Sequence, residues 1–178
     1  MKAQQYNFFN HDKKHLKTYF GGSGLKHNPK TARPISTKDT MHVVLKSDLA
    51  TGALSFLKIE RQIVGLVRNL GITLGVQVSD VVVMRNHIHL AIRVKSRRRF
   101  QNYLRALGGV IARKVLGAEK NSRAKLRNFF KGRPFSRIVA SGRKSFRDLA
   151  NYFELNRWER RGFSKERSRD LGLLNLRC

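Results

Sequence analysis

Cysteine and acidic residues are scarce in this sequence. It has one cysteine among 178 residues, Cys178, which excludes a disulfide framework and a zinc site built from cysteines. It has 11 Asp and Glu residues against 38 Lys and Arg residues, so its formal net charge is +27 at pH 7. A charge of this size favours a polyanionic partner, and nucleic acid is the leading candidate.

Long apolar runs are missing as well. The most apolar stretch, residues 70–84, is interrupted by Gln77, Ser79 and Asp80, and no apolar segment follows Lys2. We therefore expect neither a membrane span nor a secretion signal. The N-terminal residues also lack the amphipathic helix or lipidation signal that binding to a membrane surface would need. The single cysteine fits the reducing environment of the cytoplasm.

The length and a hydrophobic content of 40% predict one globular domain with flanking segments. Residues 1–40 are basic and polar, with a GGSG stretch and two prolines, and are interpreted as a poorly ordered arm. That arm either drapes over nucleic acid or only keeps the protein soluble. The periodic patterns of residues 41–163 predict the folded domain, and residues 164–178 are interpreted as a tail.

Two kinds of hydrophobic pattern alternate within this domain. Alternation of apolar and polar residues predicts strands at residues 41–46, 76–84, 87–94 and 133–141. Apolar residues at helical spacing predict helices at residues 56–72, 99–116 and 145–161. Strand, helix, hairpin, helix, strand is the plan of an α+β, ferredoxin-like fold, an antiparallel sheet with two helices on one face. The helix predicted at 145–161 is additional to this plan.

Two histidines on one predicted strand are the first candidate functional residues. Side chains alternate along a strand, so His87 and His89 share one face, about 7 Å apart at their Cα atoms, while Ile88 and Leu90 face the other way. Two ring nitrogens at this spacing suit joint binding of one metal ion. The alternative is that both histidines are incidental residues on a solvated sheet face.

The additional helix predicted at 145–161 helps to decide between a metal site and incidental histidines. Tyr152 and Asn156 lie one turn apart at the edge of its apolar stripe. If the other two helices cover the apolar face of the sheet, this helix can lie against the histidine face, with the phenol and the amide near the imidazoles. A divalent ion there would act as a Lewis acid on a phosphate oxygen while Tyr152 attacks phosphorus. The products would be a covalent phosphotyrosine and a free 3′-hydroxyl.

The segment VVVMRNHIHLAIRV and the later segment FRDLANYFELN resemble the single-tyrosine HUH transposases of insertion sequences. The stretches ARPISTKDTMHVVLKS and KGRPFSRIVASGRKSFRDLANYFELNRWERRGF are similar to the REP-associated members of that family, so the resemblance covers residues 33–163. It implies a catalytic domain at residues 41–163, Mg²⁺ or Mn²⁺ as cofactor, and a 5′-phosphotyrosine intermediate. Single-stranded or hairpin DNA would be the substrate, in the nucleoid of a bacterial cytoplasm.

The same resemblance assigns roles to individual residues. It implies that His87 and His89 bind the metal, that Tyr152 is the nucleophile, and that Asn156 helps to hold the metal. Some relatives dimerise and share the tyrosine helix while others act alone, so a homodimer stays open. Relatives commonly read Asn-Pro after the apolar stretch of this helix, whereas here Asn156 is followed by Arg157, which predicts a longer helix.

Basic residues around these positions are the candidate DNA contacts. One group should flank the histidines, and the other leads into the tyrosine helix. The candidates are Lys46, Arg85 and Arg93 in the first group, and Arg133, Arg137, Arg143 and Lys144 in the second. The basic run at residues 96–100 could also bind phosphate, because the start of a helix favours anions.

Other side chains could take the site roles. Tyr103 is the rival nucleophile, but it neighbours an apolar stripe and is interpreted as a core residue. His42 could line the histidine face, although an ordinary strand histidine is the favoured interpretation. Glu154 and Asp148 could be metal ligands, but an acidic residue in so basic a chain more often pairs with arginine.

Two alternatives to a DNA transesterase remain at this point. A basic nucleic-acid-binding protein could keep the fold and the charge without the chemistry. A metal-dependent hydrolase could use the ion to activate water, although no clear carboxylate base lies near the histidines. Charge does not separate the first alternative from the enzyme, because both predict nucleic-acid affinity that falls with salt.

Overall fold

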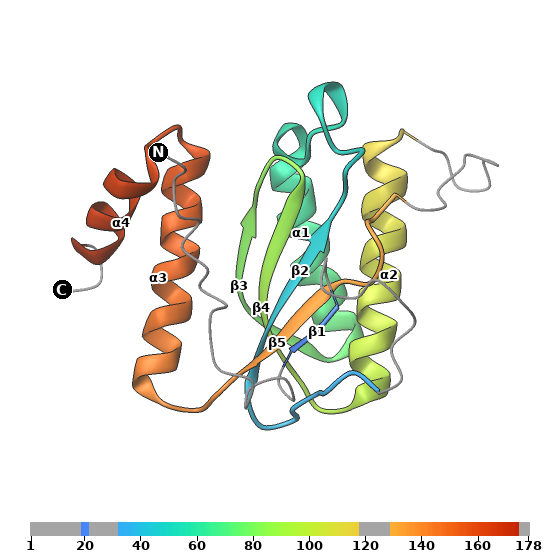
Figure 1. The fold of residues 1–178 in the computed structure, drawn as a ribbon. Coiled ribbons are helices and arrows are strands. Elements are labelled where there is room, and N and C mark those ends of the chain that lie inside the picture. The colour runs from blue at the N-terminus through green and yellow to red at the C-terminus, as the bar shows by residue number, and fades with distance from the viewer. Residues whose placement is uncertain (1–18, 22–31, 118–128, 175–178) are drawn as a thin grey trace.

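A five-stranded antiparallel sheet with helices on both faces forms the centre of the molecule (Figure 1). The computed structural model describes residues 19–21, 32–117 and 129–174. Most of the segment interpreted as an arm lies outside these described residues. Within the described ranges, no helix is long and apolar enough to cross a membrane.

The sheet follows the ferredoxin-like plan. Its strands are β1 (Tyr19–Phe20), β2 (Thr40–Lys46), β3 (Val76–Val83), β4 (His87–Val94) and β5 (Phe135–Val139), in the spatial order β1-β5-β2-β4-β3. The last four strands in this order are those predicted from the sequence, and the predicted α+β fold class is confirmed. The hairpin between β3 and β4 closes at residues 84–87, where the Met84 amide donates to the His87 carbonyl at 2.8 Å.

Two helices cover one face of the sheet and enclose the main core. They are α1 (Glu60–Leu74), preceded by the short 3-10 turns η3 (Gly52–Leu54) and η4 (Phe56–Ile59), and α2 (Arg97–Val115). Strand residues such as Val43, Leu45 and Leu90 pack there against Ile63 and Phe100 of the helices, and all five side chains are buried. Because side chains alternate along a strand, the residues between them face the other way.

The third helix, α3 (Arg143–Arg160), lies on that other face (Figure 1). Leu149 and Phe153 of α3 pack against Val82, Ala91 and Val139 of the strands in a second, smaller apolar cluster. Burial of a Leu or Phe side chain contributes roughly 1.5–3 kcal/mol, so this cluster alone gives α3 a modest attachment. The helix α4 (Lys165–Leu174) runs beside α3 (Figure 1).

Two ion pairs add to the attachment of α3. Arg157 pairs with Asp80 of β3 and with Glu154 one turn earlier in α3. Arg160 pairs with Glu60, at the first residue of α1. The helix therefore continues past Asn156, as the absence of a proline predicts, and its last turn carries the cations that hold it to the body of the protein.

The predicted element boundaries differ from the observed ones for local reasons. The strand predicted at 133–141 is shorter, from Phe135 to Val139: Pro134, which has no N–H to donate, precedes its first residue. The helix predicted at 56–72 ends later, at Leu74, where Gly75 in the left-handed region caps it. Besides the short turn η3, two elements were not predicted: β1 lies within the segment interpreted as an arm, and α4 within the segment interpreted as a tail.

The two ion pairs of α3 give a testable prediction. The double variant Glu60→Gln, Asp80→Asn should increase amide hydrogen exchange in α3, measured by mass spectrometry, and leave exchange in α2 unchanged. If the pairs together contribute about 1–2 kcal/mol, the increase should be about five- to thirty-fold. Asp48→Asn is the control, because the Lys131–Asp48 pair does not involve α3. Unchanged exchange in α3 would show that the apolar cluster suffices.

Candidate functional site

The histidine face of β4 is the centre of the candidate site, and α3 covers it. His89 is 3% exposed, and its ring centroid lies 4.8 Å from that of His87. Tyr152 of α3 reaches the same place, with its ring centroid 5.3 Å from that of His89. The structure thus brings together, within one chain, the two histidines and the tyrosine that the sequence singled out.

His42 of β2 also belongs to this site, which corrects the favoured interpretation of an ordinary strand histidine. Its side chain is fully buried, and its Nε2 lies 3.1 Å from Nδ1 of His89. The two residues meet because the β2–β4 register places Val44 opposite His89, so His42 is the diagonal neighbour on the same face. The sequence contains no direct signal for this contact, because it does not show the register in which the two strands pair.

The hydrogen bonds of the histidines leave the same ring nitrogen available in both. Nδ1 of His87 lies 2.9 Å from Oδ1 of Asn86, and Nδ1 of His89 contacts His42. Nε2 of His89 is buried and has no hydrogen-bond partner among the described residues. Few buried polar atoms in folded proteins lack a partner, so this nitrogen is available to a ligand.

Burial keeps these imidazoles neutral. Desolvation, and secondarily the charge of Arg137, lowers the pKa of His42 to about 3. Desolvation with the charge of Lys46 lowers the pKa of His87 to about 4, and burial beside the other two histidines holds the pKa of His89 well below 6.5. A neutral imidazole is the form that binds metal ions.

Tyr152 is held in its protonated form by the same desolvation. Burial raises the pKa of Tyr152 above its usual value of 10, and the charge of Glu159 adds to the rise. A hydrogen bond with the side chain of Asn156 and the positive charge of Arg137 act in the opposite direction. Ionisation of this phenol at neutral pH therefore needs a further positive charge nearby.

Asn156 lies buried one turn after Tyr152. Its side-chain Nδ2 donates to the Tyr152 carbonyl at 2.6 Å. No group of three or more His, Cys, Asp or Glu side chains in the described ranges is arranged to hold a metal ion. An ion bound at His87 and His89 would therefore need other oxygen donors, and the Asn156 carboxamide, which forms a hydrogen bond with the Tyr152 side chain, is one that the sequence proposed.

The predicted DNA contacts fall into two groups in the structure. Lys46 lies opposite His87 in the β2–β4 register, and the positive charge of Arg137 acts on both His42 and Tyr152, so these two cations belong to the site. The other five lie at or near the ends of β4, β5 and α3. Arg93 is on β4, Arg85 in the hairpin turn and Arg133 before β5, while Arg143 and Lys144 start α3, with Arg143 about 14 Å along the helix axis from Tyr152.

A second cationic cluster lies on the α1/α2 side of the sheet, and one member of it, Arg33, was not singled out in the sequence. Arg33 stacks over the rings of Phe20 and Phe100 and donates to Oγ of Ser136 at 2.7 Å. Desolvation and the charges of Arg133 and Arg97 lower its pKa to about 10. Three arginines thus gather near the start of α2, where the sequence predicted a phosphate-binding helix end.

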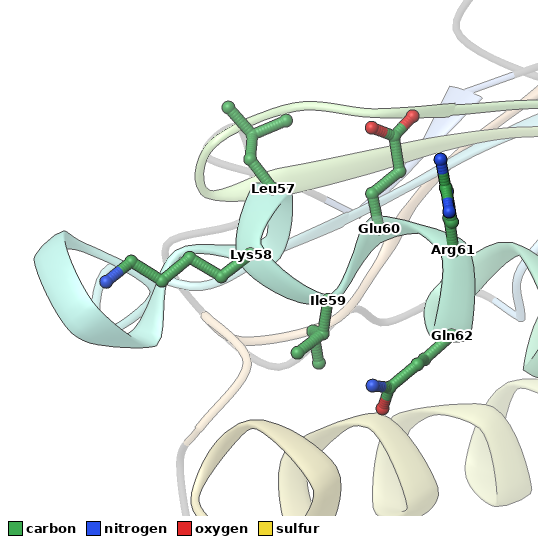
Figure 2. A pocket seen from close by; sticks show the side chains of 6 residues that line it. All are labelled: Leu57, Lys58, Ile59, Glu60, Arg61 and Gln62. Atoms are coloured by element: carbon green, nitrogen blue, oxygen red, sulfur yellow. The ribbon is translucent and has the colours of Figure 1, made fainter.

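Two competing features of the molecule do not form a catalytic site. Tyr103 is buried in the core and its hydroxyl donates to the Val67 carbonyl at 3.0 Å, as its interpretation as a core residue predicts. A pocket at the start of α1 is lined by consecutive residues of one segment, Leu57 to Gln62 (Figure 2). The carboxylate in this pocket, Glu60, is already paired with Arg160.

Comparison with known proteins supports the fold. The sequence matches no protein-family model and no curated protein. A REP-associated tyrosine transposase, solved in complex with a REP hairpin, has a similar structure, with a TM-score of 0.57 and 13% identity over 74% of each chain. A protein assigned as a transposase from Deinococcus radiodurans R1 aligns with a TM-score of 0.45 and 15% identity over 72% of this chain and 98% of that chain. The first comparison confirms the resemblance seen in the sequence at the level of the fold.

The low pKa values of the buried histidines predict the pH dependence of stability in metal-free protein. Unfolded histidine has a pKa of 6.5, so between pH 6.5 and about 4 the unfolded state binds more protons than the folded state. Stability should therefore fall as pH falls through this range, by up to about 1.4 kcal/mol per pH unit for each histidine that stays neutral. Urea denaturation across the range measures this slope.

Removing one of these imidazoles tests the origin of that slope. His42→Phe should reduce the dependence of stability on pH by the contribution of one histidine, because the variant leaves all other titratable groups, including the carboxylates, in place. An identical slope in this variant would show that His42 does not stay neutral in the folded protein.

Proposed function

We propose that the protein is a metal-dependent DNA transposase of the tyrosine HUH type, which cleaves and joins single-stranded or hairpin DNA through a 5′-phosphotyrosine intermediate. The observation that carries this proposal is the meeting of His87, His89 and Tyr152 on one buried sheet face, from two separate elements of the same chain. The positive charge of the chain and of Lys46 and Arg137 suits a phosphodiester substrate.

The residues present fit a divalent ion such as Mg²⁺ or Mn²⁺. Both histidines engage Nδ1 in a hydrogen bond, which leaves Nε2 as the ligand atom, and Nε2 of His89 is buried with no partner in the part of the protein that the structure describes. Hydrogen bonds on the far nitrogen are the usual way in which proteins orient metal-binding histidines. The Asn156 carboxamide is the proposed third ligand. When bound, the ion would polarise a non-bridging phosphate oxygen.

In the proposed reaction, the Tyr152 oxygen attacks phosphorus and forms a new O–P bond. The bond from phosphorus to the 3′-oxygen of the upstream nucleotide breaks, and that oxygen leaves as a 3′-hydroxyl. The proton lost by the phenol balances the proton gained by the leaving group. Arg137 favours the phenolate, which burial otherwise opposes. Attack by the 3′-hydroxyl of a second strand reverses the step and releases Tyr152.

The partner and assembly follow from the same site. The REP-associated transposase with this fold was solved on a REP hairpin, which favours hairpin DNA as the substrate here. The histidines and the tyrosine meet within one chain, so a homodimer is not needed to complete the site. The place of action would be the nucleoid of the bacterial cytoplasm.

The covalent intermediate tests this proposal directly. A hairpin oligonucleotide labelled at its 3′ end should become attached to the protein in Mn²⁺, and the adduct should survive denaturation in detergent. The same oligonucleotide labelled at its 5′ end should give only a shortened free product. Tyr152→Phe should abolish the adduct, because it removes the nucleophilic oxygen. Tyr103→Phe is the matched control and should retain it.

The outcomes separate the alternatives. DNA binding without cleavage would favour a non-catalytic basic binding protein on this fold. Cleavage without an adduct would favour a hydrolase. An adduct that persists in Tyr152→Phe but disappears in Tyr103→Phe would transfer the nucleophile to the other tyrosine.

The role of Lys46 can be read from the salt dependence of DNA binding. If Lys46 contacts one phosphate of single-stranded DNA, Lys46→Ala should reduce the slope of log K against log salt concentration by about 0.7. Fluorescence anisotropy over a series of salt concentrations measures the slope. Arg68→Ala is the control, because Arg68 is exposed on α1, on the other side of the sheet. Equal changes in both variants would mean that Lys46 only contributes to the overall charge.

A further inference from the structure

His42 is an unusual residue for its position. It is fully buried on β2 and surrounded by rings, with centroids 5.5 Å from those of Tyr152 and Phe153 and 6.1 Å from that of Phe135. Burial of a polar ring is unfavourable unless both of its nitrogens find partners. Nε2 contacts His89, but Nδ1 is buried without a partner among the described residues. An apolar side chain at this position would stabilise the folded protein more than an imidazole does. The presence of histidine here therefore needs an explanation other than stability.

Counting protons across the contact between His42 and His89 provides one. A neutral imidazole carries one N–H, and its other nitrogen has only a lone pair. Between Nε2 of His42 and Nδ1 of His89, one nitrogen donates and the other accepts, so two arrangements are possible. When His89 donates from Nδ1, its Nε2 keeps the lone pair. When His42 donates from Nε2, the proton of His89 lies on Nε2 instead.

These arrangements differ in what His89 can bind. A metal ion needs the lone pair of Nε2, so only the first arrangement makes His89 a ligand. His87 has the same arrangement already, because Oδ1 of Asn86 is an acceptor and the proton of His87 must then lie on Nδ1. Asn86 thus acts on His87 as His42 would act on His89.

We infer that His42 is a positioning residue: its Nε2 accepts the Nδ1 proton of His89 and so presents the His89 Nε2 lone pair to a divalent ion. This inference rests on the metal site of the proposed function. Losing such a hydrogen-bond partner of a ligand typically weakens metal affinity about 10- to 100-fold. His42 touches neither the ion nor the DNA in this role.

The first experiment needs neither metal nor DNA. Two-dimensional ¹H–¹⁵N NMR of the metal-free full-length chain, labelled with ¹⁵N-histidine, shows which ring nitrogen of each histidine carries the proton. The His89 signals are assigned from their loss in His89→Gln. We expect the proton of His89 on Nδ1 in the wild-type protein. A proton on Nε2 would overturn the inference without the use of any His42 variant.

Two variants of His42 then separate positioning from packing. His42→Phe keeps a ring but has no acceptor, so the buried Nδ1–H of His89 loses its partner and its proton should move to Nε2. His42→Gln offers a side-chain oxygen as acceptor and should keep the proton on Nδ1. Thermal unfolding of both variants checks that each is folded. The same His89 tautomer in the wild type and in His42→Phe would contradict the role of His42.

Mn²⁺ binding, measured from the loss of the electron paramagnetic resonance signal of free Mn²⁺, provides the second readout. His42→Phe should weaken binding about 10- to 100-fold, and His42→Gln should restore most of the affinity. If both variants lose binding as completely as His89→Gln does, His42 is itself a ligand and the inference is wrong. If the wild-type protein binds no Mn²⁺, the metal site of the proposed function fails, while the NMR measurement still decides the tautomer of His89.

Discussion

The exclusion of water between the sheet and α3 is the constraint on which the candidate site depends. Leu149 and Phe153 of α3 close over the histidine face, and the imidazoles beneath them stay neutral because they are desolvated. The same desolvation has opposite effects on the two halves of the proposed reaction. It prepares the histidines to bind a cation, and it opposes ionisation of Tyr152. A bound cation would resolve this opposition, because its charge would favour the phenolate.

Acidic residues are few in this chain, and two of those that the structure describes, Asp80 and Glu60, hold α3 to the rest of the protein. Asp80 and Glu154 pair with Arg157, and Glu60 pairs with Arg160. Each of these pairs is partly exposed and weak by itself, so α3 depends on the pairs and the small apolar cluster together. Arg157 follows Asn156 within α3, which continues to Arg160, and it joins the helix to Asp80 of β3.

The fold and most of the site residues could be predicted from the sequence because both rest on local patterns. The alternation of apolar residues predicted the strands, and the helical spacing predicted the helices that cover them. That His87 and His89 lie on the same face of the sheet follows from strand geometry alone. The position of Tyr152 followed from an unassigned helix and an uncovered sheet face. The contributions of β1 and Arg33 could not be predicted, because they depend on pairing and packing between segments far apart in the sequence. The helix α4 packs against its sequence neighbour α3 and lies within the segment interpreted as a tail.

His42 shows most clearly what a sequence alone does not contain. Its contact with His89 exists because Val44 pairs with His89, and a shift of the β2–β4 register by one residue would turn His42 into the main core. That register is determined by the apolar face, where Met41, Val43 and Leu45 must point toward α1 and α2. The packing of the core on one side of the sheet therefore determines which imidazole supports His89 on the other, so core substitutions that disturb β2 would alter the site without touching it.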